Sequence, residues 1–184
     1  TSFTGEDSLD ISLDAGNAQG AIGEFDLNGA HLTAGSDALS VDGVSYTFPV
    51  GDSMTVFVGD NTDGSSFFTT ACAYGGPGNT LDDCANVNAG ITGGGLAVGA
   101  AYDFGNGFTV ATGLQTTETS ILTKETNDSY ALNAAYIDDS YGVSVTYSTN
   151  ETGTNGVDSD TYTALNAYYC LLYTSDAADE AIGV

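Results

Sequence analysis

The sequence predicts an all-β protein: an antiparallel, up-and-down, transmembrane β-barrel, of which this chain forms an incomplete part. Three observations predict this fold class. A hairpin unit recurs at nearly constant spacing, its strands place bulky apolar side chains on one face only, and the connections between strands alternate between short and long. The chain has 184 residues, of which 25 are glycine and 11 tyrosine, and this length suits one all-β unit.

The first predicted elements are a strand at residues 9–15 and a hairpin of strands 44–48 and 54–58. In the first strand, leucine and isoleucine alternate with aspartate and serine. Slipping its register by one residue would turn two aspartates toward lipid, at a cost of up to ~4 kcal/mol for a charge at mid-bilayer. We therefore expect this register to be fixed. Pro49 falls at a strand end, where its missing N–H costs little.

A strand core then occurs three times, at residues 96–104, 130–137 and 163–169. The centres of these cores read Val-Gly-Ala-Ala-Tyr, Leu-Asn-Ala-Ala-Tyr and Leu-Asn-Ala-Tyr-Tyr, and they are offset by 34 and then 33 residues. A tight turn and a second alternating strand follow the first two cores. Gly105 and Gly107 supply the positive φ values that the first turn requires. The repeat is therefore a long β-hairpin.

Each hairpin separates its side chains by size and polarity, because successive side chains of a strand point to opposite faces. Tyr130, Leu132 and Tyr136 share one face, whereas Ala131 and Asn133 take the other. The bulky face suits lipid, and the face rich in Ala, Gly, Ser, Thr and Asn suits a water-filled lumen. Tyrosines six residues apart also hint at an aromatic girdle. The predicted lumen-facing side chains are Asp10, Ser12, Asp14, Asp103 and Asn133.

The lengths of the connections distinguish a barrel from a soluble β-sandwich, whose strands also alternate. Outer-membrane barrels have short turns at one end and long loops at the other. The water-facing surface of a sandwich normally carries Lys, Glu and Thr, whereas the second face here is mostly Ala, Gly, Ser, Thr and Asn. Short connections are predicted at 50–52, 105–107 and 138–139, and long ones at 60–95, 117–129 and 149–160.

The charge balance is extreme. The chain has 25 acidic residues, Lys124 as its only base and a net charge of -24. This excludes ordinary nucleic-acid binding and polybasic attachment to anionic lipid, both of which need Lys and Arg. Two interpretations of the acidity are compatible: adaptation to a salty medium, and attraction of cations. The sequence contains no run of ~18 apolar residues, so it predicts no transmembrane helix.

The longest connection, residues 60–95, holds a cysteine pair. Cys72 and Cys84 read as a disulfide in an oxidising compartment, worth about 3 kcal/mol. With no histidine nearby, the pair does not predict a metal site. One hypothesis folds this loop inward, so that Asp82 and Asp83 bring negative charge to a constriction. The alternative is an extracellular cap with solvated aspartates.

The two ends of the chain do not read as native boundaries. The start resembles a strand end that enters a turn, so the chain is expected to begin inside a domain. Residues 170–184 resemble the translation of a sequencing adapter, and we exclude this stretch, Cys170 included, from the predicted barrel domain of residues 1–169.

Several segments together resemble the cyanobacterial outer-membrane porins, relatives of the carbohydrate-selective OprB-type porins that are often labelled iron-uptake porins. They are residues 1–7 (TSFTGED), 44–49 (VSYTFP), the cysteine loop, and 102–108 (YDFGNGF). The resemblance implies a sixteen-stranded barrel, of which this chain would hold about eight to ten strands. It also implies an outer-membrane location, contact with lipid, and passage of small solutes such as sugars, inorganic ions or iron. Such barrels commonly form homotrimers.

The predicted function is therefore passive diffusion of small hydrophilic solutes and ions, with a preference for cations. The alternative is a secreted, acidic, calcium-binding β-rich adhesin, suggested by the acid-rich stretch 60–64 and the glycine-rich stretch 75–80. Neither stretch matches a calcium-loop pattern fully. An enzyme is not expected, because His31 stands alone and no nucleophile has an evident activating base. No cofactor is implied.

Overall fold

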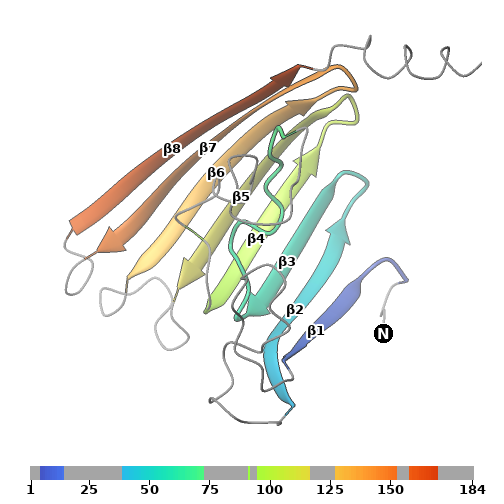
Figure 1. Ribbon diagram of the computed structural model, residues 1–184. Helices are drawn as coiled ribbons and strands as arrows, with labels where there is room; N and C mark the ends of the chain where they lie inside the picture. Colours follow the sequence, from blue (N-terminus) through green and yellow to red (C-terminus); the bar gives the residue numbers. More distant parts are fainter. Residues whose placement is uncertain are drawn as a thin grey trace, which may run out of the picture.

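The computed structural model describes residues 5–14, 39–72, 91, 95–116, 127–152 and 158–169. These residues form one eight-stranded antiparallel sheet in which each strand pairs with the next along the chain (Figure 1). The predicted all-β, up-and-down sheet is thus confirmed. The strands are β1 (Ser8–Asp14), β2 (Ser40–Val50), β3 (Met54–Asp60), β4 (Leu96–Asp103), β5 (Phe108–Thr116), β6 (Asp128–Ile137), β7 (Tyr141–Thr152) and β8 (Asp158–Tyr169).

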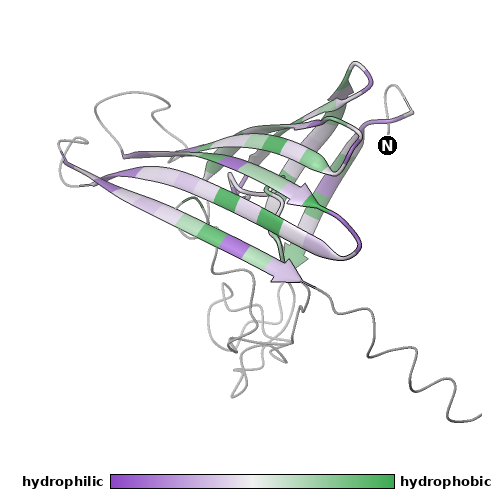
Figure 2. Cartoon of the chain, turned by 90° about the horizontal axis from the view of Figure 1, so that it is seen from above, coloured by the Kyte–Doolittle hydropathy of each residue, from purple (hydrophilic) through white to green (hydrophobic). Residues whose placement is uncertain are grey.

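The sheet is curved but not closed. Seen from above, it forms an open wall, and β1 and β8 are its two edges (Figure 2). The turns that join β2 to β3, β4 to β5 and β6 to β7 are short and lie at one end, which we call the short-turn end. In the part of the chain that the structure describes, no helix is long and apolar enough to cross a membrane.

The β4–β5 turn illustrates why these turns form. Gly105 and Gly107 have φ values of 75° and 84°, a region that other residues adopt at a cost. The Asp103 carboxylate accepts a hydrogen bond from the Gly105 backbone N–H (2.8 Å), and the Asn106 side-chain oxygen accepts one from the Phe108 N–H (3.2 Å). The sequence GNG therefore reverses the chain within four residues, as its composition predicted.

One predicted connection is wrong. Residues 149–160 were expected to form a long loop, but β7 runs to Thr152 and β8 starts at Asp158, so only 153–157 connect them. Thr149 pairs with Thr161, and Thr152 pairs with Asp158. The bulky apolar alternation stops in this stretch, but its threonines and serines still favour extended backbone and continue the ladder.

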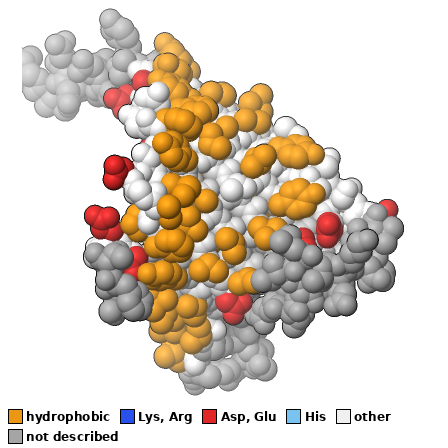
Figure 3. Space-filling model, turned by 180° about the vertical axis from the view of Figure 1, so that it is seen from behind, with side chains coloured by type: hydrophobic (Ala, Val, Ile, Leu, Met, Phe, Trp, Pro, Cys, Tyr) orange, Lys and Arg blue, Asp and Glu red, His pale blue; other side chains and the backbone are white. Residues whose placement is uncertain are grey.

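The two faces of the sheet differ as the alternation predicted. Bulky apolar side chains point outward and stay exposed, for example Leu132 at 59% and Val145 at 42%. Side chains on the opposite, inner face are buried in the strands away from the two edges, for example Ala131 at 3% and Ser144 at 2%. Figure 3 shows the outer face, where hydrophobic side chains form broad bands over the strands.

The predicted register of the first strand is also observed. Leu9, Ile11 and Leu13 lie on the outer face with exposures of 42%, 53% and 54%. The β1–β2 ladder shifts by one residue between Ser12 and Leu13, and this bulge keeps apolar side chains of β2 outward on both sides of it.

Candidate functional site

A chain segment lies across the inner face of the sheet. We call residues 61–72 the strap. It begins where β3 ends, and Asn61 turns the chain there with a φ of 51°. The Asn61 side-chain nitrogen donates to the backbone oxygen and to the carboxylate of Asp42 (2.5 and 3.0 Å), next to the β1–β2 bulge. Figure 1 shows this segment passing in front of the central strands.

On β5, the strap sits in a socket that only glycine leaves open. The Gly64 N–H donates to the Gln115 side-chain oxygen (3.0 Å). A Cβ atom on Gly113 would lie 1.9 Å from the Gly64 backbone oxygen, so any side chain at this position would displace the strap. Ile91, which is 1% exposed, closes the same socket, since a Cβ on Gly113 would lie 3.0 Å from its Cδ1 atom.

On β3 and β4, the strap is held by aromatic packing. Phe67 contacts Phe57 edge to face, with ring centroids 4.9 Å apart. Phe57 is 2% exposed and lies on the inner face, over Gly99, where an added Cβ would lie 2.2 Å from the Phe57 ring. The sequence analysis did not single out Phe57. The available signal was its position, because a large ring stands there in a row of small residues.

On β6 and β7, the strap is held by polar side chains. The Asn133 side-chain oxygen accepts a hydrogen bond from the Thr69 N–H (3.0 Å), and its nitrogen donates to the Thr69 carbonyl (3.1 Å). The Ser144 hydroxyl accepts a hydrogen bond from the Ala71 N–H (2.9 Å). The Thr109 hydroxyl, from β5, donates to the Thr69 hydroxyl (3.1 Å).

The strap covers the inner face of the central strands. The side of the strap that points away from the sheet therefore takes the place of part of that inner face. Ser65 and Ala71 are buried against the wall, while Ser66 is exposed and Phe68 and Thr70 are half-buried. Beneath the strap, Ala97, Ala111, Ala131 and Ala135 are each at most 3% exposed. The first part of the predicted long loop therefore lies inside the curve of the sheet.

The predicted site residues fall at different places. Asp10 and Ser12 lie on the inner face of β1 and are exposed, and Asp103 is exposed at the short-turn end of β4. Asn133 lies on the predicted face but is 2% exposed, because the strap covers it. Cys72 is disulfide-bonded. Its predicted partner Cys84, the two loop aspartates Asp82 and Asp83, and the side chain of Asp14 lie outside the described residues.

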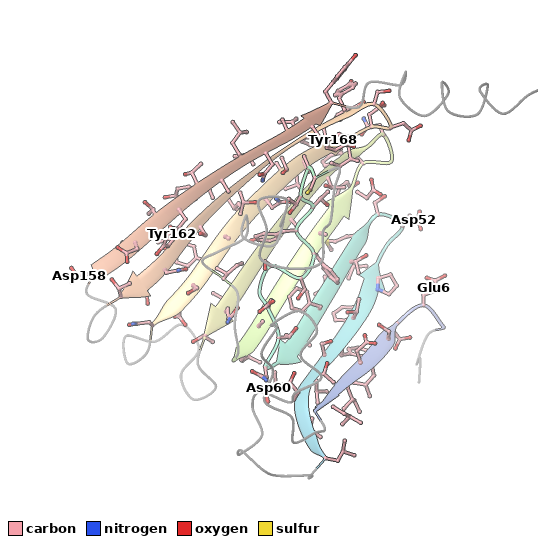
Figure 4. All side chains as sticks on the ribbon, in the orientation of Figure 1. Glu6, Asp52, Asp60, Asp158, Tyr162 and Tyr168 are labelled. Carbon is pink, nitrogen blue, oxygen red and sulfur yellow. The ribbon has the colours of Figure 1, made fainter. Side chains whose placement is uncertain are left out.

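The acidic side chains gather at the two ends of the strands. Figure 4 labels Asp52 at the short-turn end, and Asp60 and Asp158 at the opposite end. Between the ends, Asp10 is the exception among the described strand residues. At the short-turn end lie Glu6, Asp7, Asp52, Asp103, Asp138 and Asp139, and at the other end Asp42, Asp60, Asp63, Asp128, Glu151, Asp158 and Asp160.

Aromatic side chains follow the short-turn end on the outer face. The Tyr102 and Phe104 rings lie 4.7 Å apart, and Phe104 lies 5.2 Å from Phe108. On the next hairpin, the Tyr136 and Tyr141 rings stack at 5.6 Å. These rings form a row next to the acidic residues of the same end.

The chain matches no known protein family, no curated protein and no solved structure in comparisons of each kind. Within the described ranges, no group of three or more His, Cys, Asp or Glu residues is arranged to hold a metal ion.

Proposed function

We propose that the chain forms part of the wall of an outer-membrane porin, which lets small hydrophilic solutes and inorganic ions diffuse passively and prefers cations. The observation that carries this proposal is the inverted sheet: bulky apolar side chains are exposed on the outside, and polar or small ones lie inside. In a water-soluble sheet the apolar face is covered by a second layer. Here the described residues place no second layer on the outer face.

The dimensions of the uncharged band support the proposal. On β6, nine residues separate Asp128 from Asp138, and none of them is charged. At ~3.4 Å per residue they span ~30 Å along the strand, or ~23 Å along the membrane normal at a tilt of ~40°. This height is close to the ~25 Å apolar band of outer-membrane barrels. The row of aromatic rings at the short-turn end fits the interfacial girdle of such barrels.

The open edges fit a chain that contributes only some of the strands. The edge strands β1 and β8 would pair with further strands to close a barrel, since unpaired backbone groups are not tolerated in hydrocarbon. Eight strands would supply half of a sixteen-stranded pore. The strap would narrow the lumen on the side that it covers, and the acidic residues at both ends would attract cations to the pore mouths.

The experiment is reconstitution of the full-length protein in planar lipid bilayers under a KCl gradient. We expect stepwise conductance and a reversal potential that reports K⁺ preference over Cl⁻. Because mouth charges act through a screened field, the preference should weaken from ~0.1 M to ~1 M salt, as the Debye length falls from ~10 to ~3 Å. A protein that stays soluble without detergent and produces no conductance would refute the porin, and anion preference would refute the cation selectivity.

A further inference from the structure

We propose that Asn133 is a positioning residue that fixes the strap against the wall and thereby sets the free cross-section of the pore. The effect on the pore rests on the proposed function, whereas the effect on the strap does not. The sequence analysis placed Asn133 among residues that face water. The structure assigns its amide to the strap instead.

The side-chain amide of Asn133 pairs with Thr69 as a neighbouring strand would. It accepts from the Thr69 N–H and donates to the Thr69 carbonyl, at 3.0 and 3.1 Å, so both backbone groups of one strap residue are satisfied by one side chain. The nitrogen also donates to the Thr146 hydroxyl on β7 (2.8 Å), which fixes the orientation of the amide. Asn133 is 2% exposed, so water does not compete for these bonds.

Other wall side chains hold the strap on both sides of Asn133. Gln115 accepts from the Gly64 N–H, and Ser144 accepts from the Ala71 N–H. Asn133 lies between these anchors and makes two hydrogen bonds to the strap; Asn61 also makes two with the wall, but Asn61 is exposed to water whereas Asn133 is buried. A buried polar group left without its partner is costly. Removal of this amide takes one hydrogen-bond partner from the Thr69 N–H and one from the Thr69 carbonyl.

The strap position decides what faces the lumen. Ser66 is exposed, whereas Ser65 and Ala71 are buried against the wall. When the strap detaches from the wall, the small residues beneath it, such as Ala111 and Ala135, are uncovered. The strap, which narrowed the proposed pore, is then free to move. Loss of the Asn133 amide should therefore widen the pore and make its conductance fluctuate.

The test compares Asn133→Ala with Asn166→Ala in the full-length protein. Asn166 lies on the inner face of β8, paired with Ser144, and its side-chain nitrogen has no hydrogen-bond partner, so the same truncation there removes no hydrogen bond from that nitrogen to the strap. In detergent micelles, we expect amide exchange of Thr69 and Ala71 to accelerate at least ~10-fold in Asn133→Ala only. In bilayers, we expect its single-channel conductance to rise about 2-fold, with the Asn166→Ala channel close to wild type.

A second variant, Asn133→Asp, separates positioning from a general loss of packing. Its carboxylate can accept from the Thr69 N–H but cannot donate to the Thr69 carbonyl, whereas the protonated carboxyl can donate. At neutral pH the carboxylate repels the Thr69 carbonyl that the amide nitrogen held, so the strap should leave the wall more often. After correction for intrinsic exchange rates, Thr69 should therefore exchange fast at neutral pH and regain protection on acidification. The Asn133→Ala variant should stay fast throughout.

Three results would overturn the inference. Unchanged exchange of Thr69 and Ala71 in Asn133→Ala would show that the amide does not hold the strap. If the protection of the Thr69 amide in Asn133→Asp does not depend on pH, the faster exchange in Asn133→Ala results from lost packing and not from lost hydrogen bonds. Faster exchange with unchanged conductance would show that the strap does not set the pore. If the wild-type protein forms no channel, the porin proposal fails, but the exchange measurements still decide the role of Asn133.

Discussion

The two faces of β7 reverse the usual distribution of a soluble sheet. On the outer face, Val143, Val145 and Tyr147 are 44%, 42% and 48% exposed. On the inner face of the same strand, Ser144 and Thr146 are 2% and 4% exposed. Soluble antiparallel sheets pack their apolar face on the core and leave the polar face to water. The difference shows that hydrogen bonds and the strap cover the inside, whereas the described residues leave the apolar outside uncovered.

The largest expected effect lies in the thin apolar core under the strap. Phe57→Ala removes a ring that is 2% exposed and packs on Phe67, and such truncations cost about 3–5 kcal/mol. Its neighbour Val58 points outward and is 40% exposed, so Val58→Ala should cost far less. Guanidinium unfolding of both variants in micelles measures the difference. Equal losses would mean that the two faces are not energetically distinct.

The sequence predicted the faces of the strands well, and for a local reason. Alternation is a property of each strand by itself, so the face assignments of β4 to β7 follow from residues such as Leu132 and Ala131 without knowledge of their neighbours. The short turns then account for the pairing of β2 with β3, of β4 with β5 and of β6 with β7. Where the apolar alternation stopped, after Tyr147, the sequence predicted a loop from residue 149, although the ladder continues to Thr152.

The strap contacts could not be predicted in the same way. Residues 61–66 (NTDGSS) have the composition of a turn and no period, and the inward fold was one of two open alternatives. The wall residues that hold the strap, Asn133 and Ser144, look like any other polar residues of an inner face. Their role depends on contacts 64 and 73 residues apart in the chain, which alternation does not report.

The second prediction tests what medium the outer face meets. Val145 lies near the middle of the uncharged stretch 140–150 of β7. In a bilayer, Val145→Lys should cost about 2–4 kcal/mol, because a charged side chain at mid-depth must leave water. Reversible unfolding in phospholipid vesicles measures this cost. Asp139→Lys is the matched control, since Asp139 is exposed in the turn between β6 and β7, where a charge stays hydrated.

The same pair of variants can contradict the comparison. On a water-exposed surface, a substitution such as Val145→Lys changes stability by no more than about 0.5 kcal/mol. A cost that small in vesicles, equal to that of Asp139→Lys, would mean that the outer face of β7 does not contact hydrocarbon.

A third prediction addresses the glycine socket of the inner face. Gly113→Ala places a methyl group against the Gly64 backbone oxygen, which cannot rotate away, so we expect a loss of about 1–3 kcal/mol. Gly142 is the control: an added Cβ there would meet the Tyr168 ring at 2.3 Å, and this ring can move aside at the cost of the hydrogen bond from its hydroxyl to the Asp138 carbonyl (2.7 Å). Thermal unfolding and protease cleavage within the strap should separate the two variants. If Gly142→Ala loses more stability than Gly113→Ala, the tightest packing of the inner face is at Gly142 and not in the socket around Gly113.

The smallest expected effect separates charge from hydrogen bonding at the short-turn end. Asp103→Ala removes the acceptor for the Gly105 N–H (2.8 Å) in an exposed turn, and we expect a loss of about 0.5–1.5 kcal/mol. Asp103→Asn keeps an acceptor oxygen and should keep most of the stability, but it removes one negative charge from the end of the sheet that we propose to form a pore mouth. Its reversal potential should therefore move toward zero at ~0.1 M salt and coincide with wild type at ~1 M, where screening is nearly complete. If Asp103→Asn changes stability and leaves selectivity untouched, the aspartate serves the turn alone, and the acidic residues of this end do not select ions through Asp103.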